Sequence, residues 1–314
     1  MKNNLPIILL LILLNPDYVL AETQRLINTR DMYPNVSPDG KQLVFQSNRT
    51  GSNQIFVMNI DGSDLKQLAD FPLGAETPVF SPDGETVVFA VYVGEDNNDV
   101  YTIKADGSGL KQLTKSPGYD GHPHWSFDGQ RIVFNSDRTS PDPIASWSDR
   151  WHEIFSMNAD GSDVRQHSRC QSVCTFGSLS PDGKKILYRK VIKAAGLNWE
   201  LGSIEKNSEI FVSDLSGKNE INLTRNAAFD GWPVWSMDGQ QIAFASNRSG
   251  PALTGQIWLM NTDGSGLQQI SEGPWSHAQP AWAFDGKSIY AYQLKETAEY
   301  EFGTVVRIQL KDQQ

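Results

Sequence analysis

The sequence Ser37-Pro38-Asp39-Gly40-Lys41-Gln42-Leu43-Val44-Phe45 joins a tight turn to a run of residues that favour β-strands. Asp-Gly between two β-rich runs is a strong hairpin signal, because Gly accepts a positive φ and the Asp side chain can bond to the backbone just downstream. The turn recurs five times, as Ser81-Pro82-Asp83-Gly84, Ser126-Phe127-Asp128-Gly129, Ser180-Pro181-Asp182-Gly183, Ser236-Met237-Asp238-Gly239 and Ala283-Phe284-Asp285-Gly286. The sequence therefore predicts a periodic array of hairpins.

The six turns follow one another at intervals of 44 to 56 residues, and a period in the mid-forties is typical of β-propeller blades. Two tight turns and two longer connections in one repeat imply four strands. We therefore predict an all-β fold, a six-bladed β-propeller with four antiparallel strands per blade. The second turn of each repeat reads Asp61-Gly62-Ser63, Asp106-Gly107-Ser108, Asp160-Gly161-Ser162, Asp214-Leu215-Ser216-Gly217 or Asp263-Gly264-Ser265.

The blades can be placed approximately at 34–69, 78–114, 123–168, 177–224, 233–271 and 280–310 within a propeller that spans 22–314. The strands predicted for blade one are Pro34–Ser37, Gln42–Gln46, Gln54–Asn59 and Leu65–Leu68. Blade six ends without a fourth strand. Segment 24–29 resembles the outer strands of other blades, so we expect it to pair with the last strand and close the ring without an unmatched edge.

Residues 1–21 have the three-part pattern of a cleaved export signal, with Lys2, an aliphatic run from Leu5 to Leu14, and Ala21 at the cleavage site. An uncleaved anchor is the alternative. We expect a periplasmic or secreted chain, and no membrane span in the mature part, because the aliphatic run is shorter than the roughly 20 residues that a span needs. The formal charge of −10 argues against a nucleic-acid partner.

Cys170 and Cys174 lie in one connection, and in an oxidising compartment they can form a small local disulfide. Two half-buried thiols are the alternative. A single C-x3-C without a second pair is a weak zinc signature, so neither residue is expected to bind metal.

Strand parity places both tight turns of each blade on one face, the bottom, and the variable connections on the other, the top. In repeat proteins the variable loops usually carry function. The two longest connections, 136–150 and 189–208, lie in blades three and four. Together with Trp151, which directly follows the first of them, they contribute Trp147 and Trp199 to the predicted binding surface.

The residues that precede the inner strands should surround the top mouth of the central channel. Aromatic, acidic and amide side chains there suit the binding of a peptide, a glycan or a protein loop. In an alternative interpretation Phe176 and Trp232 only cap the blade packing. Trp125, Trp235 and Trp282 are expected in the core between blades. The mouth positions are Tyr33, Thr77, His122, Phe176, Trp232 and Gln279, with Asp31, Ala75, Asp120, Cys174, Asp230 and His277 two residues earlier.

Phe45 to Arg49, Met157 to Ser162 and Met260 to Ser265 carry repeat motifs that recur from residue 34 to 310. They resemble the TolB-type (WD40-like) β-propeller family. The resemblance implies the fold, but such propellers occur in a Tol-Pal envelope scaffold, in peptidases and in oligogalacturonate lyases. Only about a dozen residues separate Ala21 from Pro34, too few for the additional domain that precedes the propeller in TolB.

His122, His124 and His277 allow a metal site, because a His-x-His pair can direct two imidazoles to one ion. Two observations argue against a metal. Blades three and six, which carry these histidines, lie opposite each other in a six-bladed ring. The positions equivalent to His124 in other blades are apolar, which indicates a packing position: they are Val79, Val234 and Ala281. We therefore expect neither a metal nor another cofactor.

No nucleophile with a matching base can be identified, so we expect a non-catalytic exported monomer that binds a protein or peptide partner of the cell envelope on its top face. The alternative is a glycan-active enzyme, such as a lyase, acting at the mouth. The residues expected to bind ligand are Tyr33, Asp120, His122, Trp147, Trp151, Phe176, Trp199, Asp230, Trp232, His277 and Gln279.

Overall fold

The computed structural model describes residues 29–142, 145, 149–193, 196–197, 203–204, 206–249, 255–296 and 301–310. The predicted signal peptide, the predicted closing strand 24–29 except for Thr29, and both Trp147 and Trp199 lie outside these ranges.

The strands form six main sheets, one for each predicted blade, with every pairing antiparallel. Blade one contains β1 (Asp31–Val36), β2 (Gln42–Ser47), β3 (Gln54–Asn59) and β4 (Lys66–Gln67). Blade two contains β5 (Ala75–Phe80), β6 (Thr86–Gly94), β7 (Asn97–Lys104) and β8 (Lys111–Gln112). Blade three contains β9 (Asp120–Trp125), β10 (Arg131–Ser136), β11 (Glu153–Asn158) and β12 (Arg165–Gln166).

Blade four adds a small hairpin, β15 with β16, to its four-stranded sheet. Its strands are β13 (Cys174–Leu179), β14 (Lys185–Ile192), β15 (Gly196–Leu197), β16 (Ser203–Ile204), β17 (Asn207–Asp214) and β18 (Ile221–Asn222). Blade five contains β19 (Asp230–Trp235), β20 (Gln241–Ser246), β21 (Gln256–Asn261) and β22 (Gln268–Gln269). Blade six contains β23 (Ser276–Trp282), β24 (Ser288–Glu296) and β25 (Glu301–Gln309).

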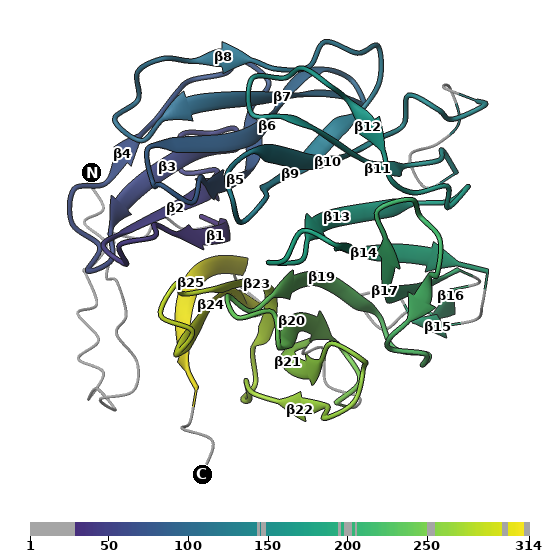
Figure 1. Ribbon diagram of the computed structural model, residues 1–314. Helices are drawn as coiled ribbons and strands as arrows, with labels where there is room; N and C mark the ends of the chain where they lie inside the picture. The colour runs from purple at the N-terminus through teal and green to yellow at the C-terminus, as the bar shows by residue number, and fades with distance from the viewer. Residues whose placement is uncertain are drawn as a thin grey trace, which may run out of the picture.

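The six sheets are arranged around a centre, with the first strand of each blade innermost and the purple first blade beside the yellow last blade (Figure 1). Strand β1 of blade one packs against β23, β24 and β25 of blade six. The amide of Gly303 donates a hydrogen bond of 3.0 Å to the carbonyl of Thr29. The prediction of a six-bladed all-β propeller is confirmed. The proposed pairing of 24–29 with blade six stays a prediction.

The inner strands begin earlier than predicted, at Asp31 rather than Pro34 in blade one. Proline cannot donate a hydrogen bond to a ladder and is normally found at edges and bulges of sheets. The inner strand is such an edge, and an irregularity between Met32 and Asn35 accommodates the proline. Pairing therefore continues past Pro34 and places Tyr33 inside the strand.

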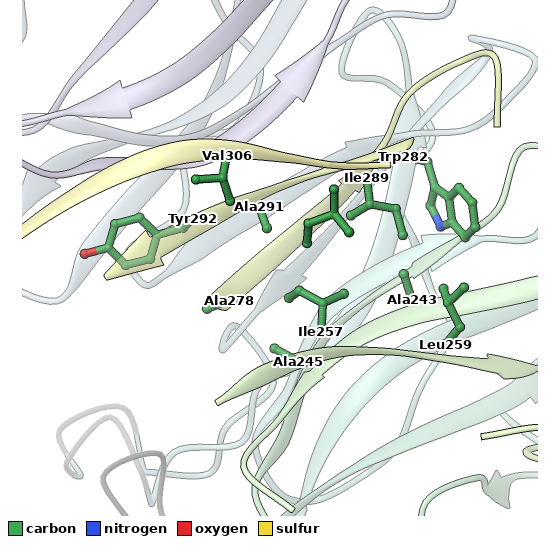
Figure 2. Close-up of a cluster of buried hydrophobic side chains, with 11 residues drawn as sticks. Ala243, Ala245, Ile257, Leu259, Ala278, Trp282, Ile289, Ala291, Tyr292 and Val306 are labelled. Atoms are coloured by element: carbon green, nitrogen blue, oxygen red, sulfur yellow. The ribbon is translucent and has the colours of Figure 1, made fainter. Parts of the chain in front are cut away.

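The hydrophobic core lies between neighbouring blades. Between blades five and six, small side chains such as Ala243 and Ala291 face Ile257, Ile289 and Trp282 (Figure 2). Strands that are covered on both faces carry apolar residues almost continuously. The predicted core tryptophans Trp125, Trp235 and Trp282 are 7%, 4% and 5% exposed, which confirms their assignment.

The recurring bottom turn is held by its own side chains. In blade one, the Ser37 hydroxyl donates a hydrogen bond of 2.7 Å to Asp39, whose carboxylate also accepts one from the amide of Lys41. These bonds lower the pKa of Asp39. The turn Gly40 has a φ of 71°. The repeat therefore marks turn geometry, as predicted.

A disulfide joins Cys170 to Cys174 at the entry to β13, with their Cα atoms 6.5 Å apart. Within the described ranges, no helix is long and apolar enough to cross a membrane.

Candidate binding site at the top of the central channel

Each inner strand carries an irregularity in its pairing at the same place. A β-bulge redirects a side chain, and a non-glycine residue with positive φ is uncommon and strained. The bulge residues all adopt a left-handed φ between 47° and 55°, and all are the predicted mouth residues Tyr33, Thr77, His122, Phe176, Trp232 and Gln279.

These six side chains line one end of a central channel with a volume of about 140 Å³. The prolines that follow five of them, and Gly177 in blade four, form the next part of the wall. Phe127, Met237 and Phe284 line the channel near the bottom turns. The bulges therefore direct one side chain from every blade into the channel, which the sequence alone predicted only as a position near the mouth.

Phe176 is the centre of an aromatic cluster formed by four blades. Its ring centroid lies 6.3 Å from that of Tyr33, 4.0 Å from that of His122 and 6.1 Å from that of Trp232. All four side chains are partly buried. The structure therefore brings together four of the residues predicted to bind ligand.

Polar side chains bridge neighbouring blades at the mouth. Gln279 accepts a hydrogen bond of 2.9 Å from the amide of Tyr33, and Gln46 accepts one of 3.2 Å from the amide of Thr77. The hydroxyl of Thr77, a residue that is 5% exposed on the channel wall, has no hydrogen-bond partner within the described residues. The backbone amides are therefore satisfied, whereas this hydroxyl can still bond to a ligand.

A buried carboxylate, Glu76, lies behind the mouth in blade two. It accepts hydrogen bonds from the hydroxyls of Tyr92 and Tyr119, at 2.5 and 3.0 Å, and from the side-chain amide of Asn98, at 2.8 Å. Burial, followed by the charge of Glu76, raises the pKa of Tyr119 well above its ordinary value. The repeat pattern does not predict this cluster, because nothing in it distinguishes Glu76 from the residues at equivalent positions.

Asp120 and Asp230, both predicted ligand residues, are fully buried and bound to arginines. Arg138 donates to both oxygens of Asp120 at 2.9 and 3.0 Å, and Arg248 donates to Asp230 at 2.7 Å. Asp31 and Arg49 form the equivalent pair in blade one. In each pair the arginine follows the aspartate by 18 residues, a spacing that could have revealed the pairing. Their predicted contact with ligand stays a prediction.

Each of these arginines also lies over two aromatic rings of its own blade. The guanidinium carbon of Arg138 is 5.3 Å from the centroid of Phe134 and 5.0 Å from that of Phe155. Cation–π attraction adds to the ion pair. The three Asp–Arg pairs therefore join the start of the first strand of each blade to the segment just after its second strand.

The three histidines of the alternative metal site bond to different partners. His122 contacts Asn135, His124 contacts the carbonyl of Trp125, and His277 contacts Gln256 and Gln293. Burial lowers the pKa of His277 to about 4. Among the described residues, no group of three or more His, Cys, Asp and Glu side chains is placed to hold a metal ion.

Trp151, the one predicted loop tryptophan within the described residues, is partly buried, and its amide donates to the Ser140 hydroxyl at 3.1 Å. The neighbouring Arg150 pairs with Asp137 of blade three and Asp96 of blade two. The beginning and end of this long connection are therefore tied to the body of the propeller.

Arg189 lies close to the mouth residues Tyr33 and His122, because its charge affects the pKa of both. It was expected at the start of the long connection 189–208, but β14 extends to Ile192 and contains it. It lies on β14 with its guanidinium carbon 5.3 Å from the centroid of Phe229. Its Nε donates to the Ser208 hydroxyl at 2.6 Å, and one Nη donates to the Thr175 hydroxyl at 3.3 Å. A basic residue on a second strand has no sequence signal for the mouth, because its direction depends on the register of the sheet.

Six blades around a channel with an aromatic upper mouth define a β-propeller of the repeat class. The chain belongs to the TolB β-propeller domain family, whose model matches residues 22–198 and 201–312.

Curated relatives match only short stretches. A protein described as a TolB homolog from Chlorobium chlorochromatii is 42% identical over 55 residues, which cover 18% of this chain and 12% of that protein. An uncharacterized peptidase, YuxL of Bacillus subtilis, is 40% identical over 67 residues, which cover 21% of this chain and 10% of the peptidase. The matches therefore span a small part of either relative's length.

Solved structures match the whole propeller. A putative TolB from Agrobacterium tumefaciens has a TM-score of 0.63 at 20% identity, covering 89% of this chain and 91% of that chain. An oligogalacturonate lyase from Vibrio parahaemolyticus has a TM-score of 0.59 at 10% identity, covering 93% of both chains. At these identities the likeness shows the fold alone.

Proposed function

We propose that this protein is an exported, non-catalytic propeller of the cell envelope that binds a protein or peptide partner at the top mouth of its channel. The observation that carries the proposal is the aromatic cluster of Tyr33, His122, Phe176 and Trp232, which four blades direct to one place. The similarity to TolB proteins supports it.

The cluster has the physical character of a binding hot spot. Aromatic side chains offer a large contact area at a low cost in conformational entropy, and binding energy concentrates on a few such residues. An engineered apolar cavity of about 150 Å³ accommodates benzene, and the channel has a similar volume of about 140 Å³. One apolar side chain of a partner can therefore enter it, while the rest of the partner contacts the mouth.

A selected peptide tests this proposal. Peptides from a random displayed library are selected on the wild-type protein, and their affinities are measured by calorimetry. We expect Phe176→Ala to weaken binding by about tenfold or more, as for a hot-spot aromatic. Phe284→Ala is the control, because Phe284 lines the opposite end of the channel. Equal affinities for wild type and Phe176→Ala would overturn the proposal.

A glycan-active enzyme is the second candidate, supported by His122 at the mouth and by the shared fold with the lyase. Acidic oligosaccharides are incubated with the protein, with and without divalent metal, and unsaturated products are followed by absorbance. Turnover that His122→Ala abolishes would replace the binding proposal with this one.

Export is part of the proposal and has its own test. N-terminal sequencing of the protein from the periplasmic fraction should begin at Glu22. Recovery of full-length chain from the membrane fraction would instead indicate an uncleaved anchor.

A further inference from the structure

The register of the sheets places Arg189 at a position that faces the mouth. Arg189 pairs with Thr175 of β13, as Gln46 pairs with Met32 and Asn135 with Gly121. In blades one and three the side chain at this position bonds to a mouth residue: Gln46 accepts a hydrogen bond from the backbone amide of Thr77, and Asn135 bonds to the ring of His122. Blade four therefore presents a cation where blades one and three present a neutral amide.

Arg189 differs from Arg49, Arg138 and Arg248 because no hydrogen bond or ion pair joins it to a carboxylate within the described residues. Arg49, Arg138 and Arg248 each bind the aspartate that begins the inner strand. In blade four the residue that begins the inner strand is Cys174, which is in the disulfide. In the part of the chain that the structure describes, the hydrogen bonds of Arg189 go only to two neutral hydroxyls, on Thr175 and Ser208, which leaves most of its five N–H donors available.

The charge of Arg189 acts at the mouth itself. Burial raises the pKa of the Tyr33 phenol, and the charge of Arg189 opposes that rise. Burial lowers the pKa of His122, and Arg189 adds to the decrease. Arg189 is partly buried, and burial lowers the pKa of its guanidinium to about 10. The guanidinium lies beside the ring of Phe229, which in turn contacts Trp232. A guanidinium that borders the aromatic cluster and keeps unused N–H donors can bind an incoming anionic group.

Partly buried charges are normally paired, because removing an ion from water is costly unless a counter-charge compensates. An arginine offers a planar fork of donors that matches a carboxylate with two parallel hydrogen bonds. The protein as a whole carries a net charge of −10, so an anion gains no general attraction and must be recognised locally.

We propose that Arg189 binds a carboxylate of the partner, and that this carboxylate is the C-terminus of a peptide whose last side chain enters the channel. The inference rests on the proposed function and names its ligand more closely. The channel below the mouth is lined by proline, valine, alanine and tryptophan side chains, which suit an apolar group. A C-terminal residue supplies a carboxylate and an apolar side chain on one carbon, whereas a uronate ring has no apolar group of that kind.

Short defined probes test the inference whatever the natural partner is. The probes are N-acetyl-Leu-Phe with a free carboxylate, the same peptide as its amide, N-acetyl-Asp-Phe amide, and digalacturonate. Affinities are measured by calorimetry, and the Arg189 Nε resonance is followed by NMR. We expect the free acid to bind about tenfold or more tightly than the amide, as for a charge-assisted bidentate contact. The Nε resonance should shift only with the acid.

The variants separate recognition from folding. Arg189→Gln should bind acid and amide equally while retaining the amide affinity, and Arg189→Lys should keep part of the preference. Arg138→Gln is the control, because it removes an arginine of the neighbouring blade whose carboxylate partner is internal and which lies three residues beyond Asn135, the position equivalent to Arg189. It should lower stability but leave the preference for the acid unchanged.

The outcomes distinguish this inference from the function on which it rests. Equal binding of acid and amide by the wild type would overturn the carboxylate site while leaving peptide binding intact. Stronger binding of N-acetyl-Asp-Phe amide would assign the site to an internal acidic side chain and overturn the C-terminal assignment. Preference for digalacturonate would overturn a peptide occupant. Absence of binding by all four probes would also overturn the inference, whereas the selected peptides test the proposed function separately.

Discussion

The ring of Tyr33 stacks on the ring of Phe176 at an interplanar angle of 17°, although the two residues come from blades one and four. This contact extends across the channel. Burial, the largest effect, raises the pKa of the Tyr33 phenol well above its ordinary value of 10.0.

Phe176→Ala should lower the pKa of Tyr33 towards that ordinary value, because the phenol regains contact with water and its ionised form is no longer penalised by burial. NMR titration of tyrosine Cζ resonances measures the change. Phe284→Ala, at the other end of the channel, should leave the Tyr33 titration unaltered. An unchanged Tyr33 titration in Phe176→Ala would show that other side chains exclude water from the phenol and would contradict this prediction.

Asp120→Asn should destabilise the protein by about 3 kcal/mol, because it leaves Arg138 without its buried counter-charge. Asp120 is fully buried, and the side chain of Arg138 is 27% exposed. Denaturant unfolding measures the difference. Lys184→Ala removes a surface ion pair whose lysine side chain is 80% exposed, and should cost less than about 1 kcal/mol. Similar losses in both variants would contradict a structural role for the buried pair.

Gly264→Ala should weaken the packing of blade five on blade four. A Cβ at residue 264 would lie 2.7 Å from the carbonyl oxygen of Leu223, and its φ is +87°. Gly40 has a similar φ of +71° with nothing within 4 Å of an added Cβ. We expect a loss of about 1 kcal/mol from backbone strain in Gly40→Ala, and about 1–3 kcal/mol more in Gly264→Ala from the close contact. Equal losses by denaturant unfolding would argue against that contact.

His277 should make stability fall as the pH drops from 6.5 to 4. Burial, the largest effect, lowers the pKa of His277 to about 4 in the folded protein, and nearby Lys295 also acts to lower it. Between these pH values the unfolded chain binds a proton that the folded chain does not, so acid favours unfolding. The resulting loss in the free energy of unfolding reaches roughly 3 kcal/mol by pH 4.

The measurement is the free energy of unfolding of wild type and His277→Gln between pH 7 and 4. The other buried histidines act in the same direction in both proteins, so the difference between the two curves isolates His277. Parallel curves would contradict the buried neutral state of this side chain.

Much of the fold could be predicted because its turns recur. Gly40 adopts the expected positive φ, and β3 has the predicted limits Gln54 to Asn59. The outer strand is shorter than predicted, at Lys66–Gln67, because only two pairs of residues align with β3. Local turn chemistry is carried by neighbouring residues, so a single sequence displays it.

The site could be predicted only in part. The six mouth positions could be predicted from their place before each inner strand. Three of these residues, Tyr33, His122 and Trp232, contact a fourth, Phe176. The repeat pattern did not reveal Glu76 or Arg189, because their roles depend on which side chains of adjacent strands and blades lie beside them. It also assigned Asp120 and Asp230 to ligand binding without indicating their arginine partners.

By itself, the sequence determined the number of blades, the positions of the turns and the tryptophans between blades, because these follow from a repeated pattern of local propensities and burial. The tertiary structure decided which charges are paired and which are left at the mouth. The reason is that electrostatic compensation depends on distance in space. Arg138 and Arg189 are the same residue type in blades three and four. Within the described residues, Arg138 forms an ion pair with Asp120, whereas Arg189 donates hydrogen bonds only to hydroxyl groups.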